Sequence, residues 1–332
     1  MPKLFKQSPH DPGNPKLPLV IVNPKSAGGS TQGSWAGIAS DLRAHFGPFQ
    51  VAFTKRSGDG ITIAHNAADS GRKFIIACGG DGTINEVANG ILTSQNTETE
   101  LGIFPSGTGG DFRRTIGMPA EAREAAKALR NGKTETIDAG KVTFINWNNE
   151  EETRFFLNVA SFGLSAEINE RVSTNSFFKW LPFGKTIRGK AKFAYSTLQE
   201  VLEIDSKVVN VSVDDGSINT LQTLNFCVCN ARFFGGGMKI APKAKLDDGF
   251  LDLVNIGDIK TARILLNSYK LYSGSHLSLP EVRSSLVKKI AVAPRDPDVE
   301  IKLEADGELP GKLPATFEIV PKALRIRVSG NN

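Results

Sequence analysis

The segment Cys78–Val87, which reads CGGDGTINEV, constrains the fold of this chain more than any other feature. The apolar run Phe74–Ala77 before it is typical of a buried strand. After it, apolar residues from Ile84 to Ile91 recur at the i, i+3, i+4 and i+7 spacing of one helical face. The segment therefore predicts a strand, a glycine-rich turn and a helix.

The glycine-rich turn has the composition of a phosphate-binding loop. Glycines leave backbone N–H groups exposed at the positive end of a helix, with no side chains to keep an anion away. A structural turn needs one or two glycines, whereas Gly79, Gly80 and Gly82 are interrupted by Asp81 and followed by Thr83. We therefore predict that this turn binds the phosphates of a nucleotide.

The first part of the chain alternates between strand and helix patterns. Strands are predicted at Leu19–Val22, Phe49–Phe53, Phe74–Ala77 and Leu101–Phe104, and helices at Ile61–Ala68, Ile84–Leu92 and Ala120–Arg130. This alternation indicates a parallel sheet covered on both faces, which binds ligands at the carboxyl ends of its strands.

After about Thr134 strand patterns dominate, which predicts an antiparallel, β-rich second domain. Strands are expected at Thr134–Val142, Arg154–Val159, Val208–Val213, Thr223–Cys229, Phe250–Ile256, Leu286–Ala293, Val299–Leu303, Thr316–Val320 and Leu324–Val328. Helices are expected near Ile187–Glu203 and Ile259–Tyr272. Residues 1–16 are rich in proline and polar residues and are expected to form a disordered leader.

Composition narrows the classes of partner and compartment. The chain of 332 residues has room for about two domains and contains no run of about 18 apolar residues that could span a bilayer. Its net charge of +5 favours an anionic partner: a nucleotide, a nucleic acid or a lipid headgroup. The cysteines at 78, 227 and 229 lack zinc spacing, and their pattern indicates a reducing cytoplasm.

Two further loops follow predicted strands of the first domain. Asn23–Ser30 suits a second wall of a nucleotide pocket, although an ordinary connecting loop explains it equally well. Phe104–Phe112 again combines glycines, hydroxyls and an acid, and two such loops at neighbouring strand ends favour nucleotide binding. The Walker pattern of P-loop proteins is absent.

Two acidic segments of the second domain are candidates for chemistry. Lys245–Leu253 offers carboxylate and carbonyl oxygens of the kind that magnesium binds, although a surface Asp-Gly hairpin explains the segment better when it is taken alone. Glu304–Glu308 also has the pattern of an Asp-Gly hairpin. A carboxylate at the tip of such a turn could accept a proton from a substrate hydroxyl.

Taken in order, these segments resemble the diacylglycerol kinase catalytic-domain family of lipid kinases, which includes soluble bacterial diacylglycerol kinases and the sphingosine and ceramide kinases. The resemblance runs from about Leu19 to Val328. It implies an α/β N-terminal domain like that of phosphofructokinases and NAD kinases, a C-terminal antiparallel β-sandwich, and ATP in the cleft between them. With the last strand returning to the first domain, the expected boundaries are 17–133 plus 316–332, and 134–315.

The resemblance also implies roles for individual residues. Contacts to ATP are implied for Asn23, Pro24, Thr54, Gly79, Gly80, Asp81, Gly82, Thr83, Ile84, Asn85, Glu86, Gly107 and Thr108. Glu308 resembles the general base, with Asp306 beside it, whereas Asp81 would hold catalytic Mg²⁺, orient the lipid hydroxyl or itself act as the base. A structural Mg²⁺ site is implied for the Lys245 and Phe250 carbonyls and the Asp248 side chain.

The predicted function is ATP- and Mg²⁺-dependent phosphorylation of a lipid hydroxyl, with diacylglycerol or a related lipid alcohol as the acceptor. Many relatives have Ala-Asn where this chain has Gly109-Gly110, which leaves the identity of the acceptor open. An NAD kinase-like enzyme acting on a soluble dinucleotide and a non-catalytic nucleotide-binding regulator are the alternatives.

The predicted partners are a membrane lipid and an anionic membrane surface, with no nucleic acid; the oligomeric state is not indicated. Arg171–Gln199 carries aromatic and basic residues without an acid, which suits an anionic bilayer. A loop that packs its aromatic residues inward explains this segment equally well. The expected location is cytoplasmic and peripherally membrane-associated.

Overall fold

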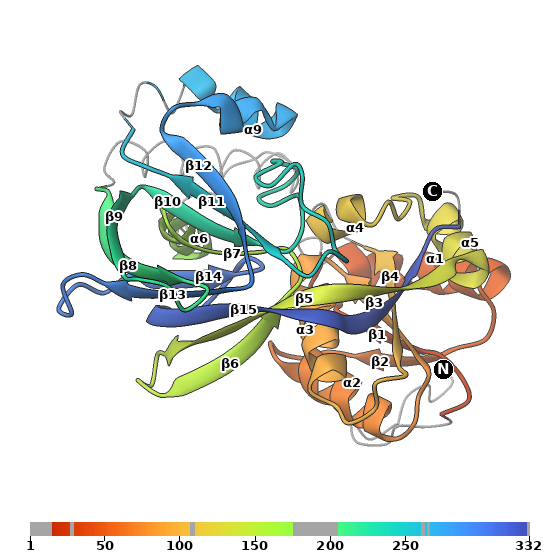
Figure 1. The fold of residues 1–332 in the computed structure, drawn as a ribbon. Helices are drawn as coiled ribbons and strands as arrows, with labels where there is room; N and C mark the ends of the chain where they lie inside the picture. The colour runs from red at the N-terminus through yellow and green to blue at the C-terminus, as the bar shows by residue number, and fades with distance from the viewer. Residues whose placement is uncertain are drawn as a thin grey trace. The chain divides into compact units, whose positions relative to one another are not determined.

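The computed structural model describes residues 15–26, 30–106, 110–174, 205–259, 263 and 266–330. Residues 1–14 of the predicted leader, the helix predicted at Ile187–Glu203 and residues 175–199 of the basic segment lie outside the described residues. The chain divides into two compact units (Figure 1): unit 1 is Met1–Ile137 with Lys322–Asn332, and unit 2 is Asp138–Pro321. The prediction placed these boundaries at 133/134 and 315/316.

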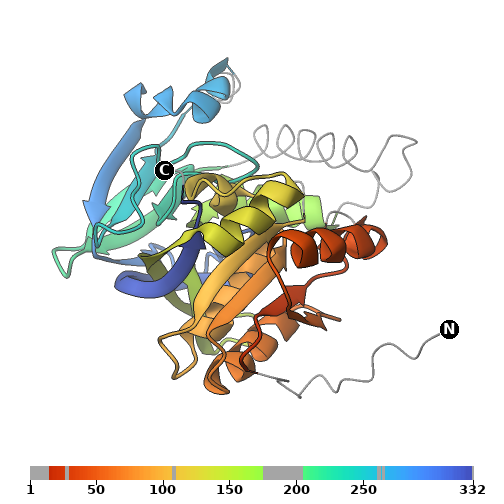
Figure 2. The same cartoon turned by 90° about the vertical axis from the view of Figure 1, so that its right-hand side faces the viewer.

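Unit 1 is a parallel α/β sheet, as predicted. Its elements are β1 (Leu19–Val22), α1 (Ser30–His45), β2 (Gln50–Phe53), α2 (Asp59–Asp69), β3 (Phe74–Gly79), α3 (Asp81–Leu92), β4 (Glu100–Pro105), α4 (Asp111–Thr115) and α5 (Ala122–Asn131). The order of its strands is β15-β4-β3-β1-β2, with the end of β15 (Glu308–Val328) pairing in parallel with β4. Helix α1 packs with α5 and α2 with α3, so that helices cover both faces (Figure 2).

The apolar pattern of the chain explains why these elements form. All four residues of β1 are buried, which is the pattern of a strand covered on both faces. In α3, the predicted face from Ile84 to Ile91 is buried against the sheet. Helix α1 was missed by the sequence analysis, because its polar and small residues give it only a weak apolar stripe.

Unit 2 is an antiparallel β-sandwich, which also confirms the predicted fold class. Its elements are β5 (Lys133–Asn146), β6 (Glu151–Phe156), β7 (Val159–Gly163), α6 (Leu164–Thr174), β8 (Lys207–Val213), β9 (Asn219–Thr223), β10 (Asn225–Cys229), β11 (Leu251–Ile256), α9 (Tyr269–Ser273), the 3-10 helix η3 (Ser275–Ser278), β12 (Val282–Val287), β13 (Lys289–Pro294), β14 (Lys302–Ala305) and most of β15. One sheet has the order β12-β11-β10-β7-β14-β15, and β13, β8, β9, β5 and β6 extend from β15.

The core of unit 2 lies between these strands. Phe162 of β7 and Phe226 of β10 stack there with their ring centroids 4.9 Å apart, and Phe317 of β15 is fully buried in the same cluster. Two buried aromatic rings in an offset stack contribute beyond their buried area.

Several strand predictions of unit 2 need correction. The strands predicted at Thr316–Val320 and Leu324–Val328 form one continuous strand, β15. Two predicted single strands are each divided in the structure: Arg154–Val159 between β6 and β7, and Leu286–Ala293 between β12 and β13. Of the helix predicted at Ile259–Tyr272, the described residues Arg263, Leu266 and Asn267 are helical, and α9 follows at Tyr269–Ser273. Within the described residues, no helix has the length and apolar character required to cross a membrane.

Candidate active site

The strands of unit 1 end at one level, so the loops that follow them start side by side. In the parallel register, Val22 is level with Phe53 and Cys78, and Cys78 with Phe104. Backbone hydrogen bonds continue one step further, from Asn23 N to the Cys78 carbonyl at 3.1 Å and from Thr54 N to the Val22 carbonyl at 2.9 Å. The structure thus brings Asn23, Thr54 and Gly79 to the same edge of the sheet.

Helix α3 begins at this edge with an open N-terminus. Its N-cap residue is Gly80, which has no side chain that could cap the first N–H groups of the helix. A Cβ atom at Gly80 would meet nothing within 4 Å, whereas one at Gly79 would lie 2.3 Å from Thr83 Oγ1. Because the first N–H groups of a helix have no acceptor within the helix, this N-terminus is suited to an anion such as a phosphate.

Because the space at Gly80 is open, a substitution there can test anion binding without disturbing the fold. A Gly80→Val variant is expected to fold, because its Cβ atom would meet nothing within 4 Å, but to fill space in front of the α3 N-terminus. We expect its affinity for ATP to fall about tenfold or more, ~1.4 kcal/mol or above, in a titration with a fluorescent ATP analogue. Gly37→Val in α1, where a Cβ also meets nothing within 4 Å, is the matched control.

Asp81 connects the first glycine loop to the start of α4. Its Oδ2 accepts hydrogen bonds from the N–H groups of Gly110 at 2.8 Å and Asp111 at 3.1 Å, and its Oδ1 accepts one from Phe112 N at 3.2 Å. Asp81 therefore positions the end of the second glycine loop. Gly107 and Thr108, which were predicted to contact ATP, lie outside the described residues.

Three other predicted ATP contacts also have structural roles. Both carboxylate oxygens of Glu86 accept from the start of α2, from Gly58 N and Gly60 N, each at 2.9 Å. Asn85 Oδ1 accepts from Asn89 Nδ2 at 3.0 Å, and the Ile84 side chain is buried in the core. These interactions fix α3 relative to its neighbours within unit 1.

A cluster of hydroxyl groups beside the glycine turn was missed by the sequence analysis. Ser26 Oγ lies 2.6 Å from Thr31 Oγ1 and 3.4 Å from Ser106 Oγ. These residues come from the loop after β1, from α1 and from the end of β4, and they meet because the strands end at one level. The available signal was that Ser26 and Ser106 each lie within four residues of the end of a predicted strand.

In unit 2, the Asp306–Glu308 segment forms the tight turn between β14 and β15, with Ala305 paired to Glu308. The Asp306 carboxylate accepts hydrogen bonds from the N–H groups of three consecutive residues, Leu157 at 2.7 Å, Asn158 at 2.9 Å and Val159 at 3.0 Å. These residues lie where β6 ends and β7 begins. Asp306 thus holds the turn against a neighbouring strand, and the next carboxylate, Glu308, projects from it.

Glu308 has a different environment from Asp306. Its side chain is 39% exposed, and its Oε2 lies 3.4 Å from Arg154 Nη1. Arg154 Nε also pairs with Glu152 at 2.7 Å. A partly exposed carboxylate on a fixed turn is suited to taking a proton from a substrate hydroxyl.

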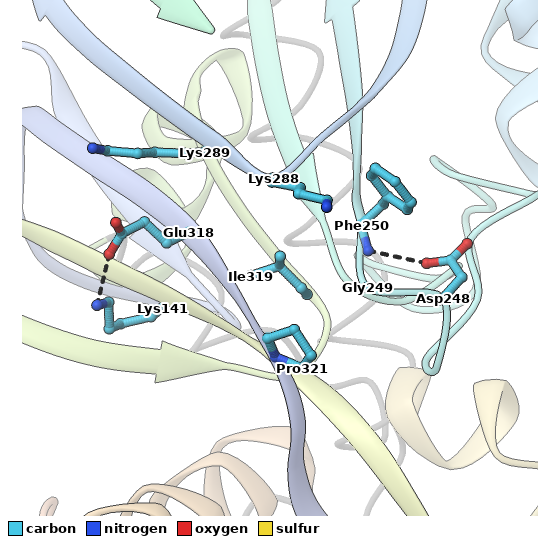
Figure 3. Close-up of a pocket in the computed structure, with 9 residues that line it drawn as sticks. All are labelled: Lys141, Asp248, Gly249, Phe250, Lys288, Lys289, Glu318, Ile319 and Pro321. Atoms are coloured by element: carbon cyan, nitrogen blue, oxygen red, sulfur yellow. Dashed lines mark hydrogen bonds and ion pairs between the residues drawn. The ribbon is translucent and has the colours of Figure 1, made fainter. Parts of the chain in front are cut away.

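The predicted metal loop lies in unit 2 beside a pocket of about 410 Å³ (Figure 3). Asp248 and Phe250 line this pocket, and Asp248 Oδ1 accepts from Phe250 N at 3.2 Å. Asp138, which the sequence analysis missed, holds the loop: its Oδ2 accepts from Gly249 N at 2.8 Å and its N–H donates to the Leu246 carbonyl at 2.6 Å. Asp138 is buried, and only its long-range partners reveal this role.

The donors in this loop fit a hard divalent cation. Burial and the like charge of Asp248 raise the pKa of Asp252 to about 6. Two carboxylates that repel each other beside loop carbonyls form a donor set of the kind that Mg²⁺ binds. The described residues contain no cluster of three or more His, Cys, Asp or Glu side chains, so the backbone carbonyls of Lys245 and Phe250 would have to complete the site.

This fit predicts that Mg²⁺ stabilises the protein in the absence of ATP. A ligand that binds only the folded state at 100 times its Kd adds about 2.7 kcal/mol to the free energy of unfolding. We expect Mg²⁺ to raise the Tm of the wild type and the gain to be mostly lost in Asp248→Asn. Asp215→Asn, at an exposed carboxylate that pairs with Lys289, is the control. An equal Mg²⁺ effect in Asp248→Asn would contradict this site.

Comparison with known proteins places these features in a family. The model of the diacylglycerol kinase catalytic domain matches residues 18–142, and that of the YegS C-terminal NAD kinase beta sandwich-like domain matches residues 158–328. A diacylglycerol kinase of Staphylococcus epidermidis is 32% identical over 266 residues, which cover 80% of this chain and 77% of the relative. This chain belongs to the diacylglycerol kinase family.

Other members of the diacylglycerol kinase family agree in sequence and fold. A diacylglycerol kinase of Staphylococcus saprophyticus is 30% identical, over 80% of this chain and 79% of the relative. The crystal structure of a candidate diacylglycerol kinase from Bacillus anthracis str. Sterne has a TM-score of 0.72 and 25% identity, over 95% of this chain and 97% of that one. The predicted family, its fold and its enzyme class are therefore confirmed.

Proposed function

We propose that this protein is an ATP- and Mg²⁺-dependent kinase that phosphorylates a hydroxyl of a membrane lipid, diacylglycerol or a related lipid alcohol. The observation that carries the proposal is the open N-terminus of α3, where Gly80 leaves space for an anion at the edge of the sheet. Membership of the diacylglycerol kinase family supports the lipid acceptor.

The proposal assigns each requirement of phosphoryl transfer to a part of the chain. Such reactions need positioning and charge stabilisation more than covalent chemistry. The N–H groups at the start of α3 hold phosphate oxygens, and Asp81 positions the second glycine loop through Gly110, Asp111 and Phe112. Glu308 takes the proton of the acceptor hydroxyl as its oxygen attacks the γ-phosphate. Bound Mg²⁺ supplies charge neutralisation on the phosphates, with Asp81 as a nearby carboxylate.

The two alternatives are an NAD kinase-like enzyme and a non-catalytic regulator. The match of unit 2 to an NAD kinase beta sandwich-like domain gives the first alternative some support from the fold. The curated relatives described above are named diacylglycerol kinases, however, and these names do not favour an NAD kinase-like enzyme. The presence of both Glu308 and Asp81 argues against a regulator that has lost its catalytic acids.

A screen of acceptors tests the proposal directly. The purified protein is incubated with ATP and Mg²⁺ and with diacylglycerol, a long-chain base, ceramide, phosphatidylglycerol, a polyprenol or NAD, and products are identified by mass spectrometry. Phosphorylation of a lipid alcohol supports the proposal, and phosphorylation of NAD alone overturns it. Omission of Mg²⁺ from parallel reactions tests the metal requirement.

We further propose that the protein works at the surface of an anionic membrane from the cytoplasmic side, because its acceptor resides in a bilayer. The same reactions in vesicles with and without anionic lipid, with sedimentation of the vesicles, test this part. Equal binding and turnover on neutral and anionic vesicles would contradict it.

A further inference from the structure

Helix α9 and the residues just before it expose large apolar side chains to solvent. Leu266, Tyr269 and Tyr272 are 74%, 65% and 55% exposed, so three of the exposed large apolar side chains of the described residues fall within seven consecutive positions. Their spacing of three residues brings neighbours to the same side of a helix. Single exposed apolar residues are ordinary on a protein surface, whereas a group of them marks an interaction surface.

The opposite side of α9 is the side that packs on the core of unit 2. Leu271 packs, partly buried, against the core cluster that contains Ile240 and Val254, and its carbonyl accepts a hydrogen bond from Lys239 N at 2.7 Å. In Figure 1, α9 lies beyond the end of β12, at the top of unit 2. A helix that packs on a core through one side normally carries polar residues on the other. Packing on the core therefore does not account for the exposed tyrosines.

The charges of this segment favour an anionic partner. Residues 259–283 contain four Lys or Arg residues and one acid, Glu281. That acid is neutralised by Arg263, whose Nη1 lies 2.7 Å from Glu281 Oε1. Lys270 of α9 and Lys239 beside it form no ion pair with any carboxylate of the described residues. The charge of these two lysines is therefore available to a partner.

An anionic bilayer is the partner that matches both the apolar and the basic side chains. The tyrosine side chain has an apolar ring and a polar hydroxyl, and it resides at the level of the lipid headgroups. Two of the three tyrosines of the chain occur on α9. A leucine side chain enters the boundary between headgroups and acyl chains, and a lysine keeps its apolar stem there while its charge contacts anionic headgroups.

We propose that the surface formed by Leu266, Tyr269, Lys270 and Tyr272, here called the α9 face, docks on an anionic lipid bilayer. The apolar side chains enter the headgroup boundary, and Lys270 contacts anionic headgroups. The inference rests on the proposed function, in which the acceptor resides in a bilayer, and it names the surface that makes the contact. The sequence analysis predicted membrane contact for Arg171–Gln199 and only a helix for this segment.

A fluorescent label on α9 tests the docking without any need for activity. The native cysteines are all buried, so a Tyr269→Cys variant can be labelled selectively with a polarity-sensitive fluorophore. We expect its emission to shift to the blue on vesicles of phosphatidylcholine with phosphatidylserine, and not on phosphatidylcholine alone. Ile218→Cys, at a position that is 73% exposed between β8 and β9, should show no shift. An unchanged emission of the Tyr269→Cys label, or an equal shift on both kinds of vesicle, would overturn the inference.

Sedimentation with the same vesicles measures the contribution of each kind of side chain. Leu266→Ser/Tyr269→Ser should lower the affinity for phosphatidylserine vesicles about tenfold or more, because two apolar side chains no longer enter the bilayer. Lys270→Gln should lower it about fivefold, which corresponds to the ~1 kcal/mol of one cation near an anionic surface.

Two control variants make the sedimentation test specific. Ile218→Ser removes an apolar side chain as exposed as Leu266, and Lys312→Gln removes a lysine that pairs with Glu300. Both should bind the vesicles like the wild type. Because Leu266 and Tyr269 are exposed, their double variant should also keep the Tm of the wild type. Wild-type affinity in Leu266→Ser/Tyr269→Ser would overturn the inference.

The alternative occupant of the α9 face is a second copy of the chain. Sedimentation velocity without vesicles tests it: a wild-type dimer that dissociates in Leu266→Ser/Tyr269→Ser would assign the face to self-association and overturn the inference. Docking through this face by a protein that phosphorylates no lipid supports the inference and refutes the proposed function. An active lipid kinase whose vesicle binding is the same in the double variant overturns the inference alone.

Discussion

Replacing Glu308 by glutamine is expected to lower kcat for lipid phosphorylation by about 10²–10⁴-fold, the usual contribution of a positioned general base. Glutamine keeps the size of the side chain but cannot take the proton of the acceptor hydroxyl. The fold should be intact, because Asp306 rather than Glu308 holds the turn to Leu157, Asn158 and Val159. Steady-state kinetics with the lipid identified in the acceptor screen, together with ATP-analogue binding, measure the effect.

The matched control for Glu308→Gln is Glu152→Gln. Glu152 pairs with the same guanidinium group, that of Arg154, at 2.7 Å, but lies in β6 rather than on the turn. If losing a partner of Arg154 were enough to impair activity, both variants would be affected alike. Full activity of Glu308→Gln would transfer the role of base to Asp81.

The second large effect is expected at Asp81. Asp81→Ala should abolish activity, because the substitution removes both the carboxylate that we propose to lie near the phosphates and the acceptor for the N–H groups of Gly110, Asp111 and Phe112. An unsatisfied buried donor costs about 1–3 kcal/mol, so the free energy of unfolding should fall as well. Activity assays and urea unfolding of the same preparation measure the two losses.

Asp81→Asn separates the two roles of the residue. Asparagine keeps one carbonyl oxygen as an acceptor, so stability should return most of the way to that of the wild type. Activity should stay low, since the charge near the phosphates is missing. Asp69→Ala, at a carboxylate that accepts from Gln95 N, is the control for the loss of an acid in unit 1. Unchanged kinase activity in Asp81→Ala would contradict the proposed nucleotide site.

The elements with strong local patterns were predicted well from the sequence. The β3-turn-α3 segment has the strand, the turn and the buried helical face that its spacing predicted. The turn at Asp306-Gly307 was predicted from two residues, and it joins β14 to β15. Helix α1 and the break between β6 and β7 were missed, because in each the local pattern is weak and packing decides.

The sequence predicted which loops carry the candidate site, but it predicted the roles of individual side chains less well. Each of the predicted site segments contains a residue that the structure places at a strand end or in a turn; these segments are Asn23–Ser30, Cys78–Val87, Phe104–Phe112, Lys245–Leu253 and Glu304–Glu308. Asp138 and the Ser26–Thr31–Ser106 cluster were missed, since their partners are distant in sequence.

The sequence by itself determined the fold class, the family and the positions of the glycine turns, because periodicity, turn residues and motif order are local properties that survive without coordinates. Only the tertiary structure decided what the acids do. Asp81, Glu86 and Asp306 bond backbone N–H groups that lie 26 or more residues away, whereas Glu308 remains partly exposed on its turn. The physical reason is that a carboxylate takes its role from the donors it meets in space, and folding selects these donors.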